Sequence, residues 1–295
     1  MHTTLNELLK DGPVVADGAW GTELQAKGLA PGESPDLWNL EFPDRVEAVA
    51  RSYVEAGSRV ILSNTFGANR FVLEGHGLAE KMETINRRGA EISRRAAGSR
   101  VKVFASLGPS GKMLMTGEVT EEALFSAFAA QAKALAAGGV AGIVVETMTD
   151  LGEAVQAVRA AKTTSLPVVA CMVFDSGKDG DRTMMGVSIE QAAEGLLGAG
   201  ADVLGANCGK GIEGFEPIAR RLVVAAGGAP VWVKPNAGLP VMEGGRIVYR
   251  ATPDGFAKAA LGLLDAGASF VGGCCGTTPG FIKAVAAGVE FRKRR

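Results

Sequence analysis

The sequence predicts an α/β protein built as a single (β/α)8 barrel that spans residues 1–295. Short β-branched or apolar runs alternate with longer amphipathic stretches eight times, without a break in composition. The chain length suits this fold, for which about 250 residues are typical. Polar residues follow nearly every apolar run, where barrel enzymes place their sites. A doubly wound open sheet is the alternative that the same alternation allows.

The strands are expected where apolar and β-branched residues cluster between turn residues. The predicted strands are Val14–Ala16, Val60–Ser63, Val101–Ala105, Gly142–Val145, Val168–Val173, Val203–Ala206, Val231–Lys234 and Ser269–Gly272.

The helices are expected in the amphipathic stretches between these runs. Several begin with capping signals, such as Ser188 followed by Gln191 and Thr252 followed by Pro253. Most end at an Ala-Gly or Gly-Gly pair, which suits the left-handed residue that closes a helix. The predicted helices are Asp44–Ala56, Glu80–Ala97, Glu121–Ala137, Leu151–Lys162, Ile189–Gly198, Phe215–Ala225, Pro253–Ala266 and Pro279–Ala287.

The composition is typical of a soluble globular protein. Hydrophobic residues make up 47% of the chain, and the net charge of −1 gives no basic field for nucleic acid. The sequence has no run long enough to span a membrane and no signal-peptide pattern at its N-terminus. We therefore expect a cytoplasmic protein that binds neither nucleic acid nor a membrane. Thiols stay reduced in the cytoplasm, so the four cysteines are expected to serve metal binding or catalysis before disulfide formation.

The most informative motif is a pair of adjacent cysteines, Cys274 and Cys275, within the glycine-rich segment 272–279. Another cysteine, Cys208, lies just past the sixth predicted strand. A vicinal pair suits an ordinary disulfide poorly, but three thiolates converging from either side of strand seven can hold one soft cation. Three protein ligands leave the fourth position of a tetrahedral zinc ion open, as in catalytic sites. Cys171 lies inside an apolar run and is expected to be a buried small hydrophobe.

A zinc ion held by three thiolates favours chemistry on sulfur. It binds a further thiolate well, and a thiol bound there loses its proton near neutral pH. The expected reaction is attack of that sulfur on an activated carbon, as in methyl transfer. Asn236 can offer its side-chain oxygen as a weak fourth ligand or make an ordinary hydrogen bond. Asp17 and Glu146 can bind a substrate ammonium group, or cap a turn or pair with an arginine.

At these positions the chain resembles the homocysteine S-methyltransferase family over nearly its whole length. It looks most like the homocysteine-binding barrel of cobalamin-dependent methionine synthase. The segments that carry the resemblance are Ala16-Asp17-Gly18-Ala19 with Gly21-Thr22, Asn64-Thr65-Phe66, Gly108-Pro109, Glu146-Thr147, Asn207-Cys208, Pro235-Asn236-Ala237-Gly238-Leu239-Pro240, Gly244-Gly245-Arg246-Ile247-Val248-Tyr249 and Gly272-Gly273-Cys274-Cys275-Gly276-Thr277-Thr278-Pro279.

The resemblance implies a zinc-dependent barrel that methylates L-homocysteine to methionine. It implies one zinc ion per chain, with Cys208, Cys274 and Cys275 as its ligands and as the catalytic residues. Acidic contacts would bind the ammonium group of the substrate, and backbone and hydroxyl donors would bind its carboxylate. The predicted substrate-binding residues are Asp17 and Glu146 for the ammonium, Asn64 and Thr65 for the carboxylate, and Asn207 and Asn236.

The methyl donor is expected to come from outside this chain. The sequence contains no corrinoid-binding Asp-x-His-x-x-Gly signature, since His76 lies in Glu74-Gly75-His76-Gly77, and no cobalamin is expected to bind to the chain itself. The preferred donor is a separate methylated corrinoid protein that docks over the carboxyl ends of the strands. S-methylmethionine or a betaine is the alternative.

Three other interpretations of the same residues stay open at this point. Lys234 or Lys210, near strand ends, could form a Schiff base with a carbonyl substrate. Gly272 and Gly273 could open a phosphate site, although two thiolates would repel a phosphate. In a non-enzymatic redox or metal-binding protein, the vicinal cysteines could form a strained disulfide.

Overall fold

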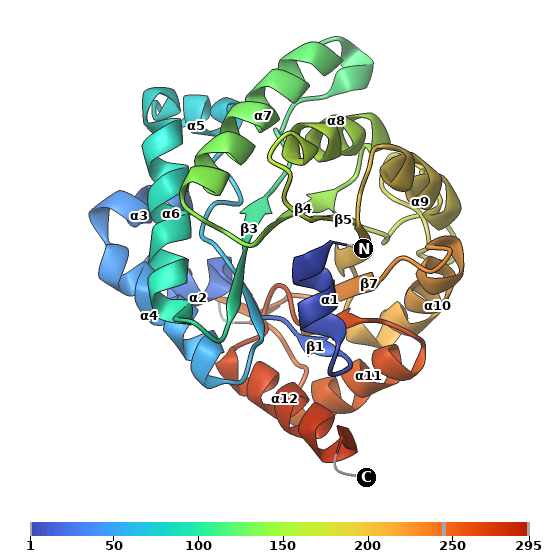
Figure 1. The fold of residues 1–295 in the computed structure, drawn as a ribbon. Coiled ribbons are helices and arrows are strands. Elements are labelled where there is room, and N and C mark those ends of the chain that lie inside the picture. Colours follow the sequence, from blue (N-terminus) through green and yellow to red (C-terminus); the bar gives the residue numbers. More distant parts are fainter. Residues whose placement is uncertain (1, 244–245, 294–295) are drawn as a thin grey trace.

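The structure is a computed structural model that describes residues 2–243 and 246–293. Eight parallel strands form a nearly closed barrel with helices around it, so the predicted fold class is confirmed (Figure 1). Gly244 and Gly245, part of one segment that carries the family resemblance, lie outside the described residues.

The eight strands are hydrogen-bonded in the order β1, β10, β7, β6, β5, β4, β3, β2. A parallel bridge between Ala16, just after β1, and Val60 on β2 connects the two ends of this order. A separate antiparallel hairpin, β8–β9, follows β7. The strands are β1 Val14–Val15, β2 Val60–Leu62, β3 Lys102–Leu107, β4 Gly142–Met148, β5 Val168–Met172, β6 Val203–Cys208, β7 Val231–Pro235, β8 Val241–Glu243, β9 Arg246–Val248 and β10 Phe270–Val271.

The predicted helices correspond to the eight helices that surround the barrel. Four agree with their predicted bounds at both ends: α7, α8, α9 and α10. The final helix extends six residues beyond the predicted Ala287, to Lys293. The outer helices are α4 Pro43–Glu55, α6 Met82–Ala97, α7 Glu121–Ala137, α8 Leu151–Lys162, α9 Ile189–Gly198, α10 Phe215–Ala225, α11 Pro253–Asp265 and α12 Pro279–Lys293, and the remaining helices are α1 Thr3–Leu9, α2 Gly21–Ala26, α3 Trp38–Glu41 and α5 Arg70–Gly75.

Helix α1 closes the N-terminal end of the barrel. It lies in the middle of the ring of helices (Figure 1), and its apolar residues Leu5 and Leu8 are buried in the cluster that fills the barrel. The histidine before it, His2, accepts a hydrogen bond from Thr4 N through its side chain. The barrel interior is therefore sealed at this end and can open only at the carboxyl ends of the strands.

Aromatic side chains fill the lower part of the barrel. Trp232 stacks on Phe104 with ring centroids 6.3 Å apart and contacts Phe270 at 5.1 Å. Gly205 makes room for this packing, because a Cβ there would lie 2.4 Å from Cys171 Sγ and 2.6 Å from the Trp232 carbonyl oxygen. Cys171 is 1% exposed within this cluster, and its predicted role as a buried small hydrophobe is confirmed.

Four strands extend farther toward the open end than the sequence predicts: β3, β4, β6 and β7. Strand β4 ends at Met148 and strand β6 at Cys208, so Glu146 and Asn207 lie on strands and not in the loops after them. Strand side chains alternate between the two faces, so a polar residue on a strand can point into the barrel. No described helix is long and apolar enough to cross a membrane.

A buried carboxylate joins two segments at the open end. Asp36 is 3% exposed, and its carboxylate accepts a hydrogen bond from Gly67 N at 3.2 Å. It therefore links the 3-10 helix Pro35–Leu37, which precedes α3, to the loop after β2. Burial raises the pKa of Asp36 to about 7 against an ordinary value of 3.8, with hydrogen bonds from the backbone opposing the shift.

We predict that Asp36 destabilises the folded protein as the pH rises. Its folded-state pKa exceeds its unfolded value, so the folded state holds an extra proton between about pH 4 and pH 7. Replacing Asp36 by Asn should therefore stabilise the protein at pH 8 relative to pH 5, by up to a few kcal/mol. Urea unfolding at both pH values measures this. Asp11→Asn, at an exposed position, is the control, and an equal effect of Asp36→Asn at both pH values would contradict the prediction.

Candidate metal centre

Three cysteine sulfurs meet at the open end of the barrel. Cys208 ends strand β6, and Cys274 and Cys275 follow strand β10, with β7 hydrogen-bonded between these two strands. Cys208 Sγ lies 3.2 Å from Cys274 Sγ and 3.9 Å from Cys275 Sγ. The three sulfurs all lie within 4.8 Å of one another. The structure thus brings together the thiols that the sequence predicts as metal ligands.

The end of strand β6 turns sharply to present its sulfur. Cys208 and Thr147, on neighbouring parts of the open end, both have a φ of 62°, in the left-handed region that non-glycine residues seldom adopt. The Asn207 side chain holds both strand ends: it accepts from Thr147 N at 2.8 Å and donates to Thr147 Oγ1 at 2.7 Å. Its amide also lies 3.9 Å from Cys274 Sγ.

Backbone contacts fix the turn that carries the vicinal cysteines. Cys274 N donates to Pro235 O and the Cys275 carbonyl accepts from Ala237 N, which ties the turn to β7. Thr277 is fully buried and its hydroxyl donates to Cys274 O at 2.7 Å. Gly273 is required beside it, because a Cβ there would lie 2.4 Å from Thr277 Oγ1.

The donor set and its spacing fit a soft metal ion. Tetrahedral zinc with bonds of about 2.3 Å to sulfur places the sulfurs about 3.8 Å apart. The distance from Cys208 Sγ to Cys275 Sγ matches this value, and the distance to Cys274 Sγ is shorter, at 3.2 Å. Hydrogen bonds from the other two thiols lower the pKa of Cys275 below its ordinary value. Nearby, Asn236 donates to Gly209 O at 2.8 Å while its buried Oδ1 has no partner among the described residues.

Tyr249 covers one side of the cysteines and was not predicted as a site residue. Its ring lies against Gly276, where a Cβ would approach Tyr249 Cγ to 2.2 Å. Burial raises the pKa of Tyr249 to about 12, and the nearby charge of Cys275 adds to the shift. The residue follows strand β9 of the hairpin, and a Gly-Gly pair between two short apolar runs is the sequence signal that predicts such a hairpin.

Asp17 lies in a buried ion pair. It is fully buried, and its Oδ1 lies 2.5 Å from Lys234 Nζ. Its Oδ2 accepts from Trp20 Nε1 at 2.8 Å and from Leu62 N at 2.7 Å. The prediction that Asp17 contacts the substrate ammonium stays a prediction, since both oxygens already accept hydrogen bonds from the protein.

The Schiff-base interpretation of Lys234 disagrees with this geometry. Burial alone would lower the pKa of Lys234, but the charges of Asp17 and Glu146 outweigh it and raise the pKa above its ordinary value. The amine is therefore protonated at neutral pH, and a protonated amine is no nucleophile.

Glu146 projects from strand β4 into the same polar layer. It is 7% exposed and accepts a hydrogen bond from Ser106 Oγ at 2.5 Å. Burial raises its pKa to about 7, and the charge of Lys234 limits the shift. A buried carboxylate that ionises near neutral pH is suited to binding a cation, because a positive group beside it compensates the cost of its burial.

Asn64 and Thr65 are buried just after strand β2, and their side chains bond to other segments of the chain. Asn64 Nδ2 donates to Pro35 O and to Asn39 Oδ1, at 2.7 and 3.1 Å. Thr65 Oγ1 donates to Ser106 O at 2.7 Å. These contacts use the amide hydrogens of Asn64 and the hydroxyl hydrogen of Thr65. The assignment of both residues to a substrate carboxylate stays a prediction, in which the backbone N–H groups of this loop would be the donors.

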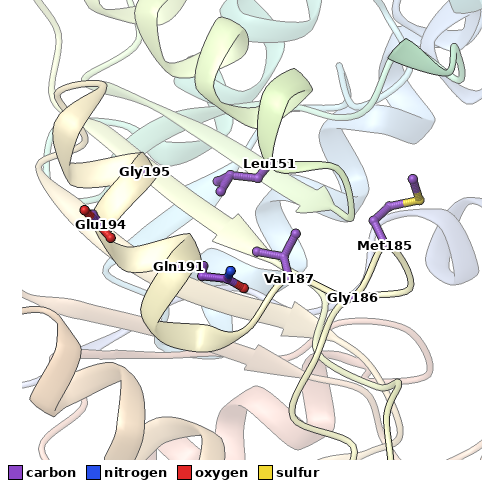
Figure 2. Close-up of a pocket in the computed structure, with 7 residues that line it drawn as sticks. All are labelled: Leu151, Met185, Gly186, Val187, Gln191, Glu194 and Gly195. Atoms are coloured by element: carbon purple, nitrogen blue, oxygen red, sulfur yellow. The ribbon is translucent and has the colours of Figure 1, made fainter. Parts of the chain in front are cut away.

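A separate surface pocket of about 500 Å³ lies outside the barrel, where helices α8 and α9 begin (Figure 2). Its lining is mostly apolar with one carboxylate, that of Glu194, and contains none of the predicted site residues. We place the candidate site at the cysteines, because this pocket has no cluster of metal ligands or nucleophiles. The pocket is lined by Leu151, Met185, Gly186, Val187, Gln191, Glu194 and Gly195.

The three thiols that could hold a metal ion lie at the carboxyl ends of the strands, where barrel enzymes have their active sites. A sequence model of the family described as homocysteine S-methyltransferase matches residues 14–289. The chain therefore belongs to the homocysteine S-methyltransferase family.

Known proteins resemble the chain over nearly its whole length. It is 34% identical to a methionine synthase of Mycobacterium tuberculosis and 33% identical to one of Mycobacterium leprae, over 99% and 97% of this chain. It spans about a quarter of the length of these relatives, 26% and 25%. The metallated form of the homocysteine methyltransferase MmuM from Escherichia coli has the same fold, with a TM-score of 0.81, 23% identity and coverage of 97% of this chain and 99% of that one.

We predict that Asn207→Ala weakens metal binding. The substitution removes the side chain that holds the two strand ends, and loss of such outer contacts typically reduces metal affinity about 10- to 100-fold. Titration of zinc into the reduced protein against a competing chelator measures it. Asn69→Ala removes another buried asparagine, the cap of helix α5, and should leave the affinity unchanged. Equal affinities of Asn207→Ala and the unsubstituted protein would contradict the prediction.

Proposed function

We propose that this barrel catalyses zinc-dependent transfer of a methyl group to the thiol of L-homocysteine, giving methionine. The observation that carries the proposal is the group of three sulfurs at the open end, from Cys208, Cys274 and Cys275. Membership of the homocysteine S-methyltransferase family supports the choice of acceptor. The barrel would act as one homocysteine-binding domain over residues 1–295.

The three cysteines would hold one zinc ion as thiolates. Bound zinc would supply coordination of the homocysteine sulfur and lower the pKa of its thiol. Asn236 could occupy the fourth coordination position of the metal, because its buried Oδ1 lacks a hydrogen-bond partner among the described residues. Substrate sulfur would replace this oxygen, which is a weaker ligand for a soft cation.

The polar layer beside the cysteines would orient the amino acid part of the substrate. Glu146 is the best placed acceptor for the substrate ammonium, since it is buried and Ser106 fixes one of its oxygens. An ammonium group binds the ionised form of Glu146. Binding should therefore strengthen as the pH rises through the pKa of about 7 that burial gives this carboxyl group.

The donor we favour is a methylated corrinoid group presented by a separate protein. Large exposed hydrophobic side chains lie in the segments that follow the barrel strands at the open end, and such surfaces are typical of protein contacts. Methionine is common at surfaces that adapt to a partner. The exposed side chains are Phe66, Met113, Met115, Met184, Leu239 and Met242. A small donor such as S-methylmethionine or a betaine is the alternative.

We predict that zinc-edge absorption of the reduced protein reports about one zinc per chain with three sulfur neighbours, and four once L-homocysteine is added. Cys208→Ser should lose most of the zinc. Cys171→Ser, which changes the buried cysteine inside the barrel, should keep the sulfur count. A zinc site whose sulfur number ignores homocysteine would refute the proposed acceptor.

We predict that methionine forms when the zinc-loaded protein and L-homocysteine receive a methylated corrinoid protein. Met115→Ser and Met242→Ser together should slow this reaction without changing homocysteine binding, because both side chains are exposed beside the open end. Val224→Ser, an exposed position on helix α10, is the control. Turnover with S-methylmethionine and none with the corrinoid protein would refute the preferred donor.

A further inference from the structure

Lys234 carries the one buried side-chain cation of the described residues. It lies on strand β7 and is 2% exposed, and no other lysine or arginine in the part of the chain described here is buried. Its stem passes Gly272, where a Cβ would lie 3.2 Å from Lys234 Cγ and 2.6 Å from the Asp17 carbonyl oxygen. Because Gly272 has no side chain, it leaves space for the stem of Lys234 inside the barrel.

The ammonium group of Lys234 has unused hydrogen-bonding capacity. It carries three N–H donors, and Asp17 Oδ1 at 2.5 Å is its one hydrogen-bond acceptor among the described residues. Asp17 is itself held by Trp20 and Leu62, so the ammonium is fixed in place. A buried N–H group of a charged side chain costs free energy when it has no acceptor. The remaining donors therefore suit an anionic ligand.

The surroundings of Lys234 match the charges of an amino acid. The negative charges acting on it come from Asp17, Glu146 and the thiol group of Cys274. One carboxylate, Asp17, is paired with Lys234, while the Ser106 hydroxyl is the one hydrogen-bond donor to Glu146 among the described residues. An α-amino acid brings an ammonium and a carboxylate on the same carbon, so it would give Glu146 a cation and Lys234 an anion.

The loop after strand β2 offers no comparable side chain. The amide hydrogens of Asn64 and the hydroxyl hydrogen of Thr65 are used within the protein. A carboxylate binds more strongly to a fixed cation than to neutral donors. Lys234 therefore has both the charge and the free donors that this substrate group needs.

We propose that Lys234 binds the α-carboxylate of the acceptor substrate, held in place by Asp17, and that it makes the site select thiols that are also α-amino acids. This inference rests on the proposed function. In it Asp17 is a positioning residue that acts through Lys234.

The test compares two thiols on the zinc-loaded protein by calorimetry: L-homocysteine and 3-aminopropane-1-thiol, which is homocysteine without its carboxylate. The unsubstituted protein should bind homocysteine about 10- to 100-fold more tightly, the range expected for a charged hydrogen-bonded contact. The double variant Lys234→Met with Asp17→Asn removes both charges of the pair together. Its preference for homocysteine should fall to about twofold or less, while its affinity for aminopropanethiol stays within about twofold.

Controls separate the possible failures. Lys210→Met, a lysine at the same open end with an exposed side chain, should keep the full preference. Zinc content shows that each variant retains its cysteine site, and Lys234→Met alone gives a second measurement of the same ratio if the double variant does not fold. An unchanged preference in the Lys234 variants would overturn this inference. Absence of binding of both thiols to the unsubstituted zinc protein would instead overturn the proposed function.

Discussion

The buried carboxylate of Asp17 is the contact on which the open end of the barrel depends. It bonds to Lys234 on β7, to the backbone of β2 and to the indole of Trp20. These contacts join the first strand to its neighbour on one side and, across β10, to β7. Removing one partner of a buried ion pair commonly costs about 3–5 kcal/mol, because it leaves the other charge unpaired. The pair thus places charge at the site and holds the strands that surround it.

Positioning of the sulfurs follows from strand order combined with local strain. Because β7 lies between β6 and β10, cysteines 66 residues apart in the chain come within 3.2 Å. The left-handed conformation of Cys208 costs free energy, about 1–3 kcal/mol for such a residue. The Asn207 side chain and the buried Thr277 hydroxyl hold the two cysteine segments in these positions. The fold itself therefore positions the three sulfurs.

Sequence periodicity was sufficient to predict the eight outer helices and strands, because helix caps and Gly pairs mark most of their ends. It was also sufficient to group Cys208 with Cys274 and Cys275, since parallel strands present their carboxyl ends at one side. It missed the pair of Asp17 and Lys234, which are 217 residues apart and share no local pattern. The uses of Asn64 and Thr65 were hidden for the same reason, because their side-chain hydrogen-bond partners are distant in the chain, such as Asn39 on α3 and Ser106 on β3.

The seal that helix α1 forms beneath the barrel imposes an order of events. With Leu5 and Leu8 closing one end, every molecule that reaches the cysteines must arrive and depart through a single mouth. A protein large enough to cover that mouth would trap whatever lies beneath it. If the proposed donor protein docks there, the smaller acceptor would have to arrive first, and the product would leave only after that protein had dissociated. Turnover would be paced by repeated docking and release, with the architecture setting the sequence of steps.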